Sequence, residues 1–301
     1  MNDRAALSLR MNHGTAGIMI KTISLIIFVT IITAGYLQAD GNTAGTKVFR
    51  LSDRKIIPHG QMVDDLRKAD IVFVGEMHDR EAHHQLQLDI IRALRAAKTP
   101  VAVGFEMFTY ESQKDLDNWV AGTIPDSDFM KTYYRNWNFP WPLYDDIFLY
   151  VRDHKIPAIA LNVPPEITRK VSASGFSSLT KEERAKLPPE TGCVVDEQYM
   201  KFIRRAHAMH GHSGKNFIYF CEAQLLWDQV MARTIIEYRK KNPDKTVVVI
   251  TGNGHAWKRG IPEQVRSLNE KTPVRVVLPH IPGHIDPAAM SPADADYILL
   301  Q

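Results

Sequence analysis

Residues 71–78 have the sequence Ile-Val-Phe-Val-Gly-Glu-Met-His. Four consecutive apolar residues, bounded by Asp70 and Gly75, are typical of a strand that is buried on both faces, because a half-exposed strand would alternate apolar and polar residues. Glu76 and His78 follow directly. The stretch therefore predicts a buried strand whose carboxyl end carries ionisable side chains.

Similar apolar runs recur along the chain and alternate with helical patterns. Further strands are predicted at 101–103, 158–161, 246–250 and 274–278, and helices at 81–97, 144–154, 217–240 and 261–270. Continuous apolar strands that alternate with helices indicate a parallel sheet covered by helices on both faces. We therefore predict an α/β fold.

No strand pattern is visible between Pro164 and Asn216. Helical patterns occupy this region instead, at 165–173, 180–186 and 195–209, and Gly175 and Pro188-Pro189 separate them. We predict a small all-helical subdomain at about 165–215, inserted into an α/β domain that spans residues 40–301.

Residues 1–39 have the features of a secretory signal peptide. Basic residues precede or open a nearly uncharged apolar stretch at 18–37, and the small residue Ala39 precedes Asp40. These features predict cleavage near Ala39 and export to the periplasm or cell envelope. The alternative is an uncleaved anchor, although an apolar run of about 16–18 residues is marginal for a bilayer span.

Charge and cysteine content exclude some classes of protein. The formal net charge is +3, and residues 1–39 carry two of these positive charges. Such a small charge argues against nucleic-acid binding. Export would permit a disulfide, but two cysteines, Cys193 and Cys221, define no disulfide framework.

Polar residues stand at the carboxyl ends of four predicted strands. These residues are Glu76, His78, Glu106, Asn162, Asn253 and His255. Ligands bind beyond the carboxyl ends of the strands in open parallel sheets, so these side chains should converge on one crevice. Carboxylates and imidazoles in such a crevice are costly unless they are paired or bound to a metal.

Two chemistries suit this set. Glu76 or Glu106 could act as a general base, with His78 or His255 as an acid or electrophile. Alternatively, the same residues could hold a divalent metal ion, although no His-Glu-x-x-His motif is present and we assign no metal ligand. A polar cap on the following helix would explain any one of these residues. It is a poor explanation for Glu76, His78, Glu106 and His255 together.

A series of short motifs runs in order through residues 70–262. They are Gly75-Glu76-Met77-His78-Asp79 with His83-His84, Gly104-Phe105-Glu106-Met107-Phe108, Trp137 with Tyr144, Ala160-Leu161-Asn162-Val163-Pro164, Ala223-Gln224-Leu225-Leu226-Trp227-Asp228 with Met231-Ala232, and Gly252-Asn253-Gly254-His255-Ala256. Each motif is weak alone. The ordered set resembles the ChaN-like haem-binding lipoprotein family, within the wider group of Tiki proteases and erythromycin esterases.

The resemblance implies a parallel sheet with a small helical domain, and haem held in a pocket formed by two subunits. It also implies that a tyrosine ligates the iron, while a histidine and a lysine from the second subunit hold the propionates. The implied role is haem or iron uptake in the bacterial envelope, with an outer-membrane haem receptor as a further partner. Members are often lipoproteins, whereas this sequence has no cysteine near residue 39 for lipid attachment.

Two tyrosines are candidates for the iron ligand. Tyr144 follows a Pro-rich turn at the start of a predicted helix, and Tyr199 lies in the helical insertion, ahead of His207 and His210. Tyr133 and Tyr134 are weaker candidates. Basic side chains near Tyr199 could pair with propionates: Lys201, Arg204, Arg205 and Lys215.

The sequence thus leaves two functions open. The first is a haem-binding homodimer of the envelope that acts in iron acquisition. The second is a hydrolase that uses Glu76, His78, Glu106 and His255. Gln224 and Asp228 share a helix face at a spacing of four residues, and we assign them no role.

Overall fold

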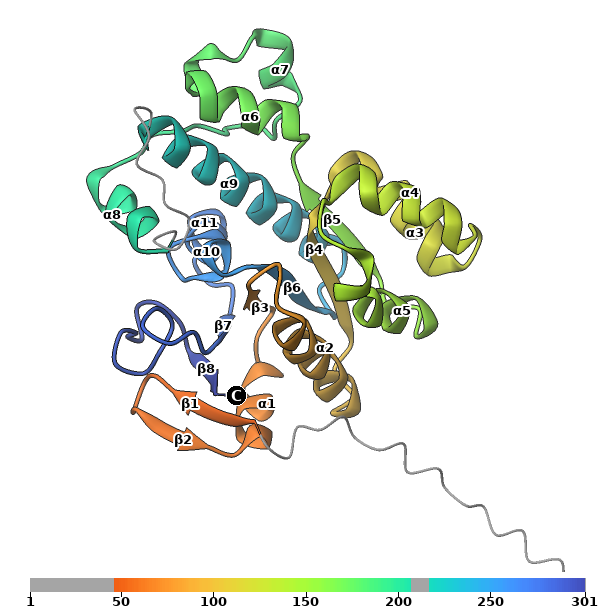
Figure 1. Cartoon of the computed structure of the whole chain (residues 1–301), viewed down its shortest axis with the longest axis vertical. Coiled ribbons are helices and arrows are strands. Elements are labelled where there is room, and N and C mark those ends of the chain that lie inside the picture. The colour runs from red at the N-terminus through yellow and green to blue at the C-terminus, as the bar shows by residue number, and fades with distance from the viewer. Residues whose placement is uncertain (1–45, 207–216, 301) are drawn as a thin grey trace, which may run out of the picture. The chain divides into compact units, whose positions relative to one another are not determined.

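The computed structural model describes residues 46–206 and 217–300 (Figure 1). The described residues form an eight-stranded sheet in the order β2-β1-β8-β7-β3-β6-β4-β5. Its strands are β1 (Lys47–Arg50), β2 (Lys55–Ile57), β3 (Ile71–Glu76), β4 (Val101–Thr109), β5 (Ala158–Asn162), β6 (Thr246–Gly252), β7 (Val274–Pro279) and β8 (Tyr297–Leu300).

The prediction of an α/β fold is confirmed, with one difference at an edge of the sheet. Strands β8, β7, β3, β6, β4 and β5 are parallel to one another, whereas β1 runs antiparallel to both β8 and β2. All five predicted strands are present. The three strands that sequence analysis missed are three or four residues long, too short for an alternation or an apolar run to distinguish them from loop.

One face of the sheet is covered by helices α1 to α5 (Figure 1). These are α1 (His59–Leu66), α2 (Glu81–Ala96), α3 (Gln113–Ala121), α4 (Asp126–Asn136) and α5 (Asp145–Asp153). Val72 and Val74 of β3 belong to the core on this face, together with aromatic side chains such as Phe105 and Phe148, whose rings stack with centroids 4.8 Å apart.

The opposite face of the sheet is covered by α8 (Glu197–Ala206), α9 (Phe217–Lys241) and α11 (Ile261–Leu268). Ile71 and Phe73 of β3 point into this second core. Because successive strand residues point to opposite faces, and both faces are buried, β3 has a continuous apolar run instead of an alternating one.

The helical patterns predicted between 165 and 215 correspond to α6 (Pro165–Ser174), α7 (Lys181–Ala185) and α8. Helix α6 packs against α9 through a separate apolar cluster that includes Val171 and Leu226. His207 and His210 lie outside the described residues, as do the predicted signal peptide and its cleavage site. Within the described ranges, no helix combines the length and hydrophobicity needed to cross a membrane.

Candidate functional site

Glu76 ends β3, and its carboxylate is surrounded by donors on the α2 and α5 side of the sheet. Oε1 accepts hydrogen bonds from His78 Nδ1 at 2.5 Å and from the Tyr144 hydroxyl at 3.2 Å, and Oε2 accepts one from His84 Nε2 at 2.8 Å. Burial alone would raise the pKa of Glu76. The positive charge of His78 and the bonds from both histidines outweigh burial, and they lower the pKa to about 2.

His78 is the positively charged partner of Glu76 in this ion pair. Burial would lower its pKa, but the charge of Glu76, the hydrogen bond between them and the charge of Glu106 raise the pKa to about 9. His78 is therefore a cation at neutral pH. Its ring packs against Trp137 and Phe139, with centroids 4.8 and 5.1 Å away, so the ion pair is closed on one side by aromatic walls.

Glu106 lies within β4, and its carboxylate is hydrogen-bonded to residues at the end of β6. Its Oε2 accepts hydrogen bonds from Thr251 Oγ1 at 2.5 Å and from the Gly252 backbone N–H at 2.6 Å. Its Oε1 lies 3.8 Å from His255 Nε2. The predicted strand-end residue Asn162 does not contact this carboxylate, because its side-chain amide donates to the Glu106 backbone carbonyl at 2.8 Å.

His255 is held by a second buried carboxylate, which belongs to Asp228 on α9. Asp228 Oδ1 accepts from His255 Nδ1 at 2.6 Å, and Oδ2 accepts from the Tyr199 hydroxyl at 3.1 Å. Burial would lower the pKa of His255, but the charges of Asp228 and Glu106 raise it. Burial also raises the pKa of Asp228. Sequence analysis gave Asp228 no role, although its position four residues after Gln224 in one motif was a usable signal.

The two networks come from opposite faces of the sheet and meet at its carboxyl edge. Glu76 pairs in register with Gly252. Of its partners, His78 follows β3, His84 lies on α2 and Tyr144 directly precedes α5. His255, Asp228 and Tyr199 belong to the α8 and α9 side. Glu106 lies between the two networks, since its charge acts on both His78 and His255. The structure thus brings together the four residues that sequence analysis proposed as catalytic: Glu76, His78, Glu106 and His255.

A cavity of about 360 Å³ opens beside these networks. Its lining includes His78 and Asn253 and the apolar side chains of Met77, Phe139 and Ile281. A volume near the lower limit of ligand pockets suits a small molecule, and apolar walls with a few polar groups are typical of such pockets.

Within the described ranges, no three His, Cys, Asp or Glu side chains form a set that could hold a metal ion. In the first network, Glu76 and its two histidines are hydrogen-bonded to one another. Cys193 and Cys221 are both free thiols, and the Cys193 thiol donates to the Glu222 carbonyl at 3.3 Å.

The tyrosines predicted as iron ligands are buried in the same networks. Tyr144 is 1% exposed and Tyr199 is 5% exposed. Burial, and the neighbouring charge of Glu76 or Asp228, raise the pKa of each hydroxyl. A haem iron needs an accessible phenolate, so neither tyrosine fits haem in the arrangement described. Tyr134 is 49% exposed, and its hydroxyl accepts a hydrogen bond from the Trp141 backbone at 3.2 Å.

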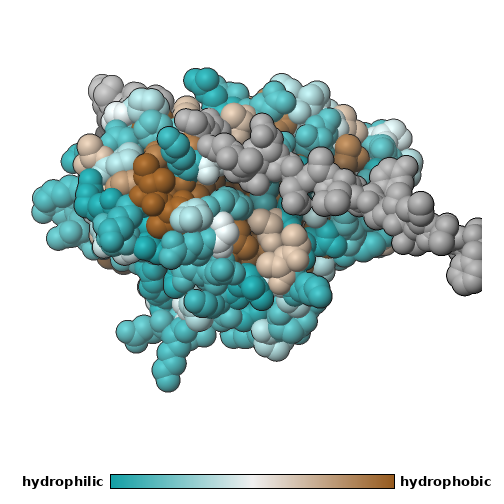
Figure 2. All heavy atoms as spheres, turned by 90° about the horizontal axis from the view of Figure 1, so that it is seen from below, coloured by the Kyte–Doolittle hydropathy of each residue, from teal (hydrophilic) through white to brown (hydrophobic). Residues whose placement is uncertain are grey.

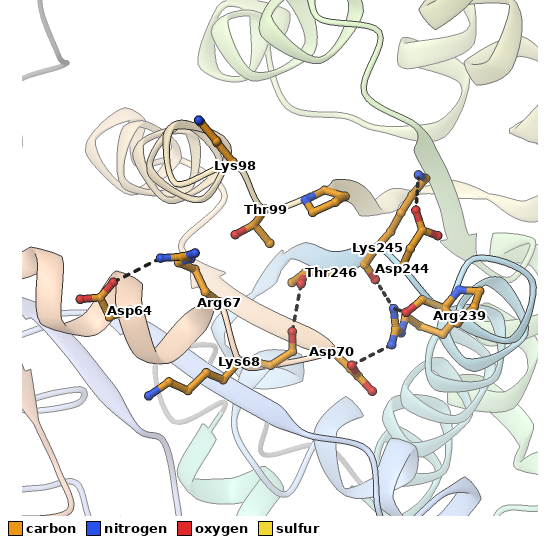
Figure 3. Close-up of a pocket in the computed structure, with 13 residues that line it drawn as sticks. Asp64, Arg67, Lys68, Asp70, Lys98, Thr99, Arg239, Asp244, Lys245 and Thr246 are labelled. Atoms are coloured by element: carbon orange, nitrogen blue, oxygen red, sulfur yellow. Dashed lines mark hydrogen bonds and ion pairs between the residues drawn. The ribbon is translucent and has the colours of Figure 1, made fainter.

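A larger open pocket, of about 750 Å³, lies at the amino ends of β3, β4 and β6 (Figure 3). Its charged residues form ion pairs, such as Arg239 with Asp70 at 2.7 Å, and Figure 3 shows Lys68 and Lys98 pointing in different directions. Viewed from below, the surface is mostly hydrophilic, with one larger apolar patch and smaller apolar areas (Figure 2). Because its charges are partly neutralised and do not converge, this pocket is not a candidate site.

An open, mostly parallel sheet with polar networks at its carboxyl edge defines an α/β protein with a strand-end site. The chain belongs to the family described as "Haem-binding uptake, Tiki superfamily, ChaN", whose model matches residues 62–265. The resemblance drawn from the ordered motifs is therefore confirmed.

A solved structure of a family member has the same fold. ChaN of Campylobacter jejuni, for which cofacial haem binding is described, superposes with a TM-score of 0.67 at 20% identity, over 84% of this chain and 96% of that one. A mutant erythromycin esterase in its open conformation has a TM-score of 0.48 at 10% identity, over 84% of this chain and 82% of its own.

Among curated proteins, the chain is 24% identical over 234 residues to Protein RETICULATA-RELATED 5, chloroplastic, of Arabidopsis thaliana. The match includes 71% of this chain and 32% of the plant protein. The chain therefore spans about a third of the length of that relative.

Proposed function

We propose that the protein binds haem in the bacterial cell envelope and acts in haem or iron uptake. Haem would lie at the interface of a homodimer, with a tyrosine as the iron ligand; Tyr144 or Tyr199 could take this role only if its hydrogen bond to a carboxylate breaks. An outer-membrane haem receptor would be a further partner. The observation that carries this proposal is the family match over residues 62–265. The fold shared with ChaN of Campylobacter jejuni supports it.

Features around α8 are suited to a covered interface. Val194, before α8, is 90% exposed, and Ile218, at the start of α9, is 55% exposed. A second subunit or a porphyrin face would remove these apolar side chains from water. Lys201 and Arg204 of α8 supply cations suited to propionates, although Lys201 pairs with Glu197 at 2.8 Å in the structure described.

Titration with ferric haem tests the proposal directly. We expect the full chain to give a saturable absorption change, and size-exclusion chromatography with light scattering should show a dimer in the presence of haem. Apomyoglobin and serum albumin serve as specific and non-specific binding controls. The absence of a saturable change at micromolar haem would overturn haem binding, whereas a haem-bound monomer would overturn only the dimer interface.

Export is tested separately. In a Gram-negative host, we expect the protein in the periplasmic fraction, with a new N-terminus close to Asp40. A chain that keeps its first 39 residues and stays in the membrane fraction would support the anchor instead.

A second candidate function is hydrolysis, because His78 and His255 both lie near Glu106 while each Nδ1 is held by its own carboxylate. We propose that Glu106, and not Glu76, is the general base. Glu76 is already the acceptor of three hydrogen bonds among the described residues, whereas Oε1 of Glu106 faces His255. A base must have an oxygen within reach of the proton that it removes.

In this reaction, Glu106 takes a proton from water while the water oxygen bonds to the acyl carbon of an ester or amide. The electron pair of the carbonyl moves to its oxygen, which the His78 cation stabilises. When the carbon–leaving-group bond breaks, the proton on Glu106 passes to the leaving group. A screen of small esters and amides should give a rate that falls at least about 100-fold in Glu106→Gln. No hydrolysis in the wild type, or an unchanged rate in the variant, would exclude this role.

A further inference from the structure

Three side chains form a chain of hydrogen bonds from α8 to the strand ends. The Tyr199 hydroxyl donates to Asp228 at 3.1 Å, and the other oxygen of Asp228 accepts from His255 Nδ1 at 2.6 Å. Tyr199 is 5% exposed, Asp228 1% and His255 7%. The chain of bonds therefore lies almost wholly out of water, where an unpaired carboxylate would be costly.

The carboxylate of Asp228 has both oxygens occupied, and this fixes the direction of His255. With Nδ1 bound to Asp228, the opposite ring nitrogen is directed at Glu106, 3.8 Å from Oε1. A carboxylate bound to one imidazole nitrogen sets the tautomer and orientation of the ring, so that the other nitrogen is presented to the reacting groups. Tyr199 keeps Asp228 from turning, because it holds the second oxygen.

We propose that Asp228 and Tyr199 are positioning residues, which hold His255 with its Nε2 toward Glu106. The purpose of this positioning rests on the proposed hydrolytic function. The hydrogen bonds that hold His255 do not depend on that function. This positioning also gives Tyr199 a role that differs from iron coordination: a tyrosine that serves as a donor to Asp228 keeps its proton.

Other groups also face His255, and they must be separated from the effect of Asp228. Glu106 approaches from β4, the charge of His78 acts from the segment after β3, and the indole of Trp227 meets the His255 ring edge-on at 5.8 Å. Of these, Asp228 contributes the largest favourable charge to His255. Substitution of Asp228 should therefore change the imidazole more than substitution of any other neighbour.

Imidazole NMR of the ¹⁵N-histidine-labelled full chain tests the inference. We expect a strongly deshielded Nδ1–H proton for His255, assigned by its loss in His255→Gln. In Asp228→Asn, this proton should move upfield and the pKa of His255 should fall, because the charge of Asp228 raises it. Asp228→Glu, which keeps the carboxylate, should recover part of both changes. Tyr199→Phe should shift the signal without abolishing it.

Tyr297→Phe is the matched control. Its hydroxyl also donates to an aspartate, Asp65, at 2.8 Å, so it loses the same type of bond in another part of the chain. We expect no change at His255. A wild-type spectrum without the deshielded proton, or an unchanged signal in folded Asp228→Asn, would overturn the inference.

The same measurements separate this inference from the proposed functions. If hydrolysis and haem binding both fail while the NMR result holds, the positioning network is real and the functions are wrong. If haem titrates through Tyr199 in the wild type, and Tyr199→Phe leaves the His255 signal unchanged, the inference fails while the haem proposal stands.

Discussion

Gly252 lies directly beside the imidazole of His78. A Cβ placed on Gly252 would lie 2.9 Å from His78 Cε1 and 3.7 Å from Glu106 Oε2. The absence of a side chain at residue 252 therefore allows the two networks to approach each other at the carboxyl edge of the sheet.

We expect Gly252→Ala to displace His78 and to weaken its ion pair with Glu76. Overpacking of this kind costs about 1–3 kcal/mol, and the pKa of His78 should fall from about 9 toward its ordinary value. Urea unfolding and histidine NMR measure the two effects. Gly60→Ala is the control, since nothing lies within 4 Å of a Cβ there; an equal loss in both variants would contradict the close approach.

Glu76→Gln should be the most destabilising conservative change at the site. It removes the charge that balances the His78 cation and leaves that cation half-buried, and breaking a buried pair costs about 3–5 kcal/mol. Chemical unfolding gives the value. Glu237→Gln removes an exposed partner of Lys240 and should cost far less, because water screens an exposed ion pair. A similar cost for both would show that Glu76 is not a buried ionic centre.

Stability should decline on the alkaline side because of His78. Its pKa is about 9 in the folded protein, above the ordinary value of 6.5. The folded state therefore binds the proton more tightly, and this contribution is complete below pH 6.5 and lost as the pH rises through 9. Thermal unfolding between pH 6 and 10 measures it. Glu76→Gln should flatten the decline, and an unchanged slope would rule out the pair as its origin.

Stability should decline on the acid side because of His83. Burial lowers its pKa from 6.5 to about 4, and its neutral Nδ1 accepts a hydrogen bond from the Met77 backbone N–H at 3.0 Å. Its contribution is present above pH 6.5 and lost as the pH falls toward 4. His83→Gln should reduce the slope in this window. The contribution of His78 is lost above pH 6.5 and that of His83 is lost below it, so the two together predict maximal stability near pH 6.5.

The tyrosine variants should distinguish the possible iron ligands. The hydroxyls of Tyr144 and Tyr199 are bonded to carboxylates, so coordination by either must break a network and change the signal of His78 or His255. Haem spectra of Tyr144→Phe, Tyr199→Phe and Tyr134→Phe, each with matching histidine NMR, test this. Loss of the tyrosinate spectrum in Tyr134→Phe alone would mean that haem binds at the surface and leaves both networks intact.

The motifs at 75–78 and 252–255 predicted both a sheet and a site at its carboxyl edge. This worked because the parallel order of β3, β6 and β4 places their ends side by side. Asp228 and Tyr199 were harder to assign, because they reach the site from helices that are separated from it in sequence. Nothing in the local pattern of α8 shows that Tyr199 points inward to a carboxylate 29 residues away along the chain.

The sequence by itself determined the class of fold, the family and the residues at the strand ends. Apolar run length, helical period and ordered motifs are local properties that can be recognised without knowing the packing. Only the tertiary structure decided which carboxylate holds which histidine, that Glu76 is enclosed by donors while Glu106 faces His255, and that both predicted tyrosines are buried. Those facts depend on distances between segments far apart in the chain, and hydrogen bonding, burial and pKa all follow from such distances.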